Sequence, residues 1–168
     1  MYGEGEEELV KAMNYILDKN EASKDMLQFT KNDKIGLLTF NTKVSDITAA
    51  LDGENTSNLL EIVKNSEPEG TTNIWDSVTK SINYLQNEDT EKYNLSIVLM
   101  TDGAGNAGNK SKMLSTIKYS KVKVPVYSIM FASADKYQLD EIASETGGEV
   151  FDGSKDLSKA FKKVRGFN

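Results

Sequence analysis

The apolar residues of the chain follow two different periods, which alternate along the sequence. A spacing of three or four residues indicates amphipathic helices over residues 9–17, with a continuation through Met26, Leu27 and Phe29, and over 59–63, 74–85, 113–117, 137–146 and 157–164. Short, nearly continuous apolar runs indicate buried strands at 35–40, 95–100, 124–131 and 150–151. A looser alternation over 44–51 indicates a hairpin partner at a sheet edge.

The order of these elements predicts the fold. Strands of five or six residues that alternate with longer helices are typical of right-handed βαβ units. We therefore expect a Rossmann-like, doubly wound α/β fold whose mainly parallel sheet has helices on both faces. Sheets of this kind bind ligands beyond the carboxyl ends of their strands, so the loops that follow strands are the first candidates for a site.

Composition narrows the classes of function. The 168 residues, 38% of them hydrophobic, suit one domain over residues 1–168. With 20 basic against 26 acidic side chains and no basic stripe, we expect no nucleic-acid partner. No apolar run approaches the ~20 residues that span a bilayer, so direct membrane insertion is not expected. Cys and His are absent, so any bound metal would be held by oxygen atoms.

Two polar loops stand out as a candidate site. One is Gly70–Asn73, which precedes the helix that begins near Ile74, and the other is Thr101–Asn106, which directly follows the most strand-like segment. Their hydroxyl and carboxylate oxygens suit a hard divalent cation. Each loop taken alone is better explained by ordinary structure, because Thr and Asn cap helices and Asp-Gly is a common turn.

Three segments in order resemble the von Willebrand factor A (vWA) family. Gly70–Asp76 is similar to its "GGTNIYDA" loop, and Leu99–Gly103 resembles its "LLTDG" strand end. Leu139–Ala143 together with Thr146–Phe151 resembles its "L..IA..TGG..F" segment. The resemblance covers nearly the whole chain. The closing residues 161–168 look like those of bacterial vWA domains that follow a solute-binding domain, which favours an extracytoplasmic or cell-surface location.

The resemblance implies a metal-dependent binding module and not an enzyme. Family members hold a divalent cation at a metal-ion-dependent adhesion site, built from an Asp-x-Ser-x-Ser segment, a Thr and an Asp. The second and third pieces correspond here to Thr72 and Asp102. The expected cation is Mg²⁺ or Mn²⁺, or else Ca²⁺, and the expected partner is a protein that offers a carboxylate. The rim of this site is assigned to Thr71, Asn73, Gly103 and Asn106, although capping and turn roles explain the last three equally well.

The first piece of that site is missing. Met1 resembles the Met that ends the family's motif, so the resemblance implies a chain that starts just after the ligands and lacks the central first strand. Metal binding by residues 1–168 alone is therefore expected to be weak or absent. Each unpaired backbone group beside the empty place would cost about 1–3 kcal/mol. We expect the gap to be closed by rearranged pairing, by strand exchange between copies, or by a strand from another chain.

Two other readings of the sequence stay open. A vWA subunit that works with an AAA-type ATPase would have the same metal site. A small α/β enzyme is the less favoured reading, because the sequence has no P-loop, no complete dinucleotide-binding loop and no His or Cys. Trp75 and Phe167 are candidates for partner contacts, with a place in the core as the favoured alternative for Trp75.

Overall fold

The computed structural model describes residues 4–66 and 70–165. Helices and strands alternate along them, as the apolar pattern indicates. The helices are α1 (Glu4–Leu17), α2 (Lys19–Ser23), α3 (Ser57–Lys64), α4 (Ile74–Leu85), α5 (Lys110–Tyr119), α6 (Lys136–Thr146) and α7 (Leu157–Val164). The strands are β1 (Ile35–Leu37), β2 (Thr48–Ala50), β3 (Ile97–Thr101), β4 (Val126–Met130) and β5 (Val150–Asp152).

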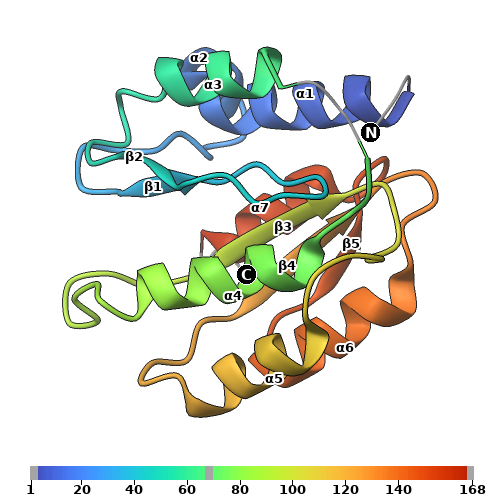
Figure 1. Cartoon of the computed structure of the whole chain (residues 1–168). Coiled ribbons are helices and arrows are strands. Elements are labelled where there is room, and N and C mark those ends of the chain that lie inside the picture. Colours follow the sequence, from blue (N-terminus) through green and yellow to red (C-terminus); the bar gives the residue numbers. More distant parts are fainter. Residues whose placement is uncertain (1–3, 67–69, 166–168) are drawn as a thin grey trace.

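The strands form two separate sheets. Strands β3, β4 and β5 pair in parallel in that order, while β1 and β2 form an antiparallel hairpin of their own (Figure 1). The expected α/β fold with a mainly parallel sheet is confirmed. Within the described residues no pairing joins β1 to β3, so the rearranged pairing that could have closed the gap does not occur.

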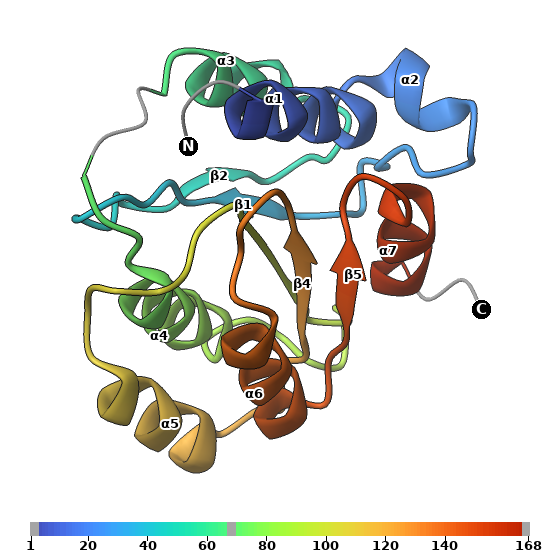
Figure 2. The ribbon, with the colours of Figure 1, turned by 90° about the vertical axis from the view of Figure 1, so that its right-hand side faces the viewer.

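Helices cover both faces of the strands, and each face has its own apolar core. Helices α4, α5 and α6 lie on one side of the parallel sheet, opposite the layer that contains α1 and α3 (Figure 2). Successive side chains of β3 point to opposite faces of the sheet and so enter both cores. Ile97 and Leu99 pack with α4 and α6, whereas Val98 and Met100 face the cluster that includes α1 and α7. This arrangement explains the nearly continuous apolar run of β3.

Two details of the predicted elements are wrong. The helix does not continue through Met26–Phe29, because α2 ends at Ser23 and Met26 takes a left-handed conformation with φ 58°. Leu27 is nevertheless fully buried, so its apolar character reflects packing and not helical period. The strand expected at 35–40 is limited to Ile35–Leu37, and its apolar residues are only half-buried, because β1 has no neighbour on the side of β3.

The search for membrane spans gave a negative result. Among the helices of the described residues, none is both long and apolar enough to cross a bilayer.

Candidate functional site

Three loops meet at the carboxyl edge of the strands. The backbone N–H of Thr72 donates to Asn106 Oδ1 at 2.8 Å, and the N–H of Asn106 donates back to the Thr72 carbonyl at 3.0 Å. The N–H of Asn73 donates to the carbonyl of Asn41, which follows β1, at 3.0 Å. These bonds bring the loop before α4 against the loops after β1 and β3, as expected for residues at the ends of neighbouring strands.

Thr72 and Asp102, the two implied metal ligands, come together at this edge. Both line the same cavity of about 780 Å³, and a Cβ atom added to Gly103 would lie 3.0 Å from Thr72 Oγ1. Within the described residues, neither the Thr72 hydroxyl nor the Asp102 carboxylate makes a hydrogen bond or an ion pair. Their oxygens are therefore available to a ligand.

The residues assigned to the rim have different surroundings. Thr71 is exposed, and its N–H and hydroxyl both bond Thr42 Oγ1, at 3.0 and 3.1 Å. Asn73 is 5% exposed, and its Oδ1 caps α4 by accepting from the N–H of Asp76 at 3.1 Å. The capping role is thus the one that its side chain performs. Gly103 packs against Thr72, and Asn106 is exposed with its side chain bonded to the Thr72 backbone.

Supporting residues hold these loops, and sequence reasoning missed them. Gln138 of α6 exchanges two hydrogen bonds with the backbone of Gly105, at 2.7 and 3.1 Å. Ser133 donates to the carbonyl of Asp102 at 3.2 Å, and Thr42 accepts from Thr71. Thr42 lies in a turn that the sequence does show, but the partners of Gln138 and Ser133 are about thirty residues away in the chain, so no local pattern marks them.

The acidic side chains of the described residues do not gather at this edge. No group of three or more acidic side chains that could hold a metal occurs among them. The carboxylate of Asp76 is engaged, since it accepts from Asn73 Nδ2 at 3.0 Å and from the N–H of Asn109 at 3.1 Å. What remains is one hydroxyl and one carboxylate, whereas Mg²⁺ demands an octahedron of oxygens and Ca²⁺ takes six to eight.

Trp75 belongs to the core. Its side chain is 6% exposed and packs in the cluster of α4, β3 and β4, so almost none of it could contact a partner. Phe167 lies outside the described residues.

Comparison with known proteins agrees with this fold. The family model of the von Willebrand factor type A domain matches residues 4–167. A von Willebrand factor type A protein from Catenulispora acidiphila superposes with a TM-score of 0.62 at 14% identity, over 92% of this chain and 37% of that one. Proximal thread matrix protein 1 from the mussel byssus, described with a zinc-occupied MIDAS motif, superposes with a TM-score of 0.63 at 17% identity, over 96% and 42%.

These similarities cover only part of each matched protein. The chain spans about two fifths of the length of the solved structures that it matches. The comparison with curated protein sequences gave no match. The family match over nearly the whole chain agrees with the α/β architecture, and on this evidence the chain belongs to the von Willebrand factor type A domain family.

Proposed function

We propose that this domain is a protein-recognition module whose binding surface is the carboxyl edge around Thr72 and Asp102. The observation that carries the proposal is that both side chains line one cavity and have oxygens without partners among the described residues. The side chains of Asn73 and Asp76, beside them at the same edge, are by contrast already engaged in hydrogen bonds.

A divalent cation would be held at this edge only with further oxygen ligands. Thr72 and Asp102 would supply one neutral and one anionic oxygen, and the family resemblance assigns the others to an Asp-x-Ser-x-Ser segment. Residues 1–168 contain no such segment. Helix α1 begins on the side of the molecule at which β3 ends (Figure 1), so a strand joined to the start of α1 could deliver these ligands to Thr72 and Asp102.

A calorimetric titration with Mn²⁺ tests this function. It compares residues 1–168 with the same chain extended at its N-terminus by an apolar strand and Asp-x-Ser-x-Ser. We expect weak or no binding by residues 1–168 and clear binding by the extended chain. In the extended chain, Thr72→Val and Asp102→Asn should each weaken binding at least about tenfold, or 1.4 kcal/mol.

Ser144→Ala is the control for these substitutions. Ser144 is exposed on α6 and has no part in the candidate site, so metal affinity should stay unchanged. Tight Mn²⁺ binding by residues 1–168 would refute the assignment of Thr72 and Asp102 as metal ligands. So would Mn²⁺ binding by the extended chain that is unaffected by Thr72→Val and Asp102→Asn.

We also propose that the domain is not an enzyme. The chain has no His or Cys, and acid–base chemistry would need a second carboxylate near Asp102. Among the described residues Asp76 is engaged by Asn73 and by the backbone of Asn109, so it is not a free partner for such chemistry.

A further inference from the structure

A second cavity lies at the opposite edge of the parallel sheet from Thr72 and Asp102. It has a volume of about 610 Å³, and three segments contribute to its lining: residues 90–96 ahead of β3, residues 121–127 leading into β4, and residues 163–165 around the end of α7. Because parallel strands begin at a common edge of their sheet, this cavity lies at the amino edge of β3 and β4.

The charge of this cavity is opposite to that of the whole chain. Its lining contains three lysines and one arginine, namely Lys121, Lys123, Lys163 and Arg165, and neither Asp nor Glu. The chain as a whole has 26 acidic and 20 basic side chains, yet its segment 109–125 has five lysines and no acidic residue. Cations gathered around one concavity raise the local concentration of anions there.

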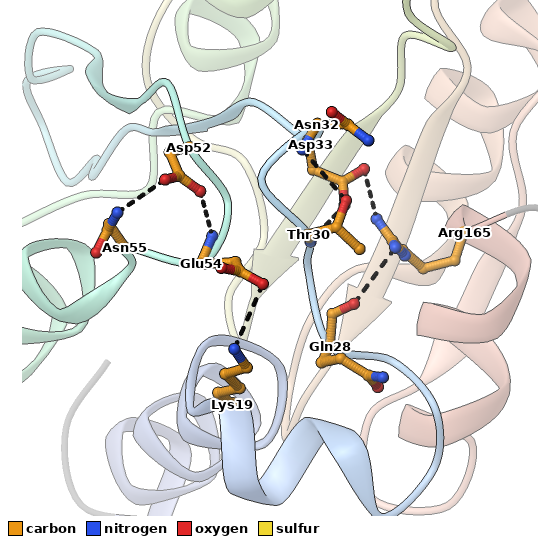
Figure 3. A network of polar contacts seen from close by, with 9 residues as sticks. All are labelled: Lys19, Gln28, Thr30, Asn32, Asp33, Asp52, Glu54, Asn55 and Arg165. Atoms are coloured by element: carbon orange, nitrogen blue, oxygen red, sulfur yellow. Dashed lines mark hydrogen bonds and ion pairs between the residues drawn. The ribbon is translucent and has the colours of Figure 1, made fainter.

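The arginine of the lining is engaged within the fold. Figure 3 shows the Arg165 guanidinium, which lies 2.9 Å from Asp33 Oδ1 and donates to the carbonyl of Gln28 at 3.4 Å. The three lysines of the lining differ from it, since among the described residues none of them takes part in an ion pair. Their ammonium groups are therefore available to an anion from outside.

The ordinary role of lysines at helix ends explains only part of this charge. Lys118 lies in the last turn of α5 and Lys163 in the last turn of α7, where the partial negative charge of the helix end favours cations. Lys121 and Lys123 lie beyond the end of α5, so the helix dipole gives no reason for them.

Hydrogen bonds hold the loop 120–125, which carries these two lysines. Ser120 Oγ donates to the carbonyl of Val122 at 2.8 Å, and the carbonyl of Pro125 accepts from the N–H of Ile97 at 3.0 Å. The loop backbone is thus fixed before any ligand binds, which lowers the entropic cost of binding.

The surroundings favour separated carboxylates over a compact phosphate group. Phosphate is typically bound by backbone N–H groups at the N-terminus of a helix, whereas α5 and α7 both end beside this cavity. The basic surface also extends past the cavity to the end of α5, where Lys118 Nζ lies 5.5 Å from the ring centroid of Tyr119. Tyr119 is 76% exposed, and tyrosine is a common anchor in protein interfaces.

We propose that this amino edge binds an acidic segment of another protein, whose carboxylates pair with Lys121, Lys123 and Lys163 while Tyr119 contacts its apolar part. The surface lies at the other edge of the sheet from Thr72 and Asp102, so the inference goes beyond the proposed function. Binding through exposed lysines depends strongly on ionic strength, because salt screens such charges.

Titration with a labelled peptide tests the proposal in buffer without divalent cations. The peptide has four glutamates spaced by serine and glycine and ends in a phenylalanine, and the control peptide has glutamine in place of every glutamate. Fluorescence anisotropy follows the binding of each peptide to residues 1–168. We expect the glutamate peptide to bind at least about tenfold more tightly at low ionic strength, and this difference to disappear at high ionic strength.

Two double variants with the same change of charge locate the binding. Lys121→Gln with Lys123→Gln should weaken binding of the glutamate peptide at least about fivefold. Lys11→Gln with Lys64→Gln removes two exposed lysines from α1 and α3, in the layer on the other side of the sheet, and should leave the affinity within about twofold of wild type. In NMR spectra, the peptide should shift the amide signals of residues 93–96 and 121–127.

Equal binding of the two peptides, no binding at all, or binding that is unaffected by Lys121→Gln with Lys123→Gln would overturn the proposal. Inorganic pyrophosphate that shifts the same amide signals and binds more tightly than the glutamate peptide would overturn it in favour of a phosphate ligand. Because divalent cations are absent, these outcomes are independent of metal binding at Thr72 and Asp102.

Discussion

Thr72 and Asn106 exchange two hydrogen bonds across the carboxyl edge of the sheet, at 2.8 and 3.0 Å, although 34 residues separate them in the chain. One of these bonds uses the side chain of Asn106, and the other joins the two backbones. The pair fixes the Thr72 hydroxyl beside Gly103 and so determines the shape of the candidate site.

Removal of the Asn106 side chain should loosen this edge. Asn106→Ala leaves the Thr72 N–H without its acceptor, and we expect a loss of about 1 kcal/mol, or about 2–4 °C in Tm. Asn106→Asp keeps an acceptor oxygen and should preserve most of that stability. Differential scanning calorimetry measures both, with Asn94→Ala as an exposed control; equal Tm values for wild type and Asn106→Ala would show that the bond contributes nothing.

Gly147 and Gly148 are adjacent but should respond very differently to the same substitution. Gly147 ends α6 with φ 77° and has open space where a Cβ would lie, so Gly147→Ala should cost only about 1 kcal/mol. A Cβ on Gly148 would overlap the backbone carbonyl of Val126. Gly148→Ala should therefore cost about 3 kcal/mol or more, measured by urea denaturation. Similar losses for the two variants would contradict this packing.

The ion pair of Asp33 and Arg165 should make stability depend on pH in acid. Burial raises the pKa of Asp33, but the Arg165 guanidinium and the N–H and hydroxyl of Thr30 outweigh it and hold the pKa below its usual value. A lowered pKa stabilises the folded state above the unfolded pKa of about 3.9, and this contribution is lost as pH falls through the folded value. Asp33→Asn should therefore destabilise the domain near neutral pH, and the difference from wild type should shrink below about pH 4.

A double-mutant cycle separates this pair from other acidic groups. Arg165→Met should produce much of the same loss, and Asp33→Asn should add little in its presence. Urea denaturation measures the free energy of unfolding of each protein. If the difference between wild type and Asp33→Asn stays constant down to pH 2, the ion pair does not contribute to the loss of stability in acid.

Local features account for what the sequence could predict. The start of α4 follows from Asn73, whose capping contact reaches only three residues ahead, and β3 follows from an apolar run that is buried on both faces. Long-range contacts account for the rest. No local sequence pattern predicts the hydrogen bonds between Gln138 and the backbone of Gly105. None predicts that Met26 has a left-handed backbone conformation while Leu27 is buried.

The length of β1 also depends on long-range pairing that the local sequence does not show. The apolar run from Ile35 to Phe40 indicates a strand covered on both faces, yet regular pairing stops at Leu37. A strand's extent depends on what pairs with it, and among the described residues β1 pairs with β2 on one edge and with no strand on the other. That the β3 edge facing β1 has no partner among the described residues could be learned only from the structure.

Amide hydrogen exchange along β3, followed by NMR on residues 1–168, tests most directly whether the β3 edge that faces β1 is unpaired. Val98 and Met100 should exchange much faster than Ile97 and Leu99, because only the latter two direct their N–H groups to β4. Uniform slow exchange of all four amides in the unbound, monomeric chain would show that β3 is already paired on both edges and would contradict the account.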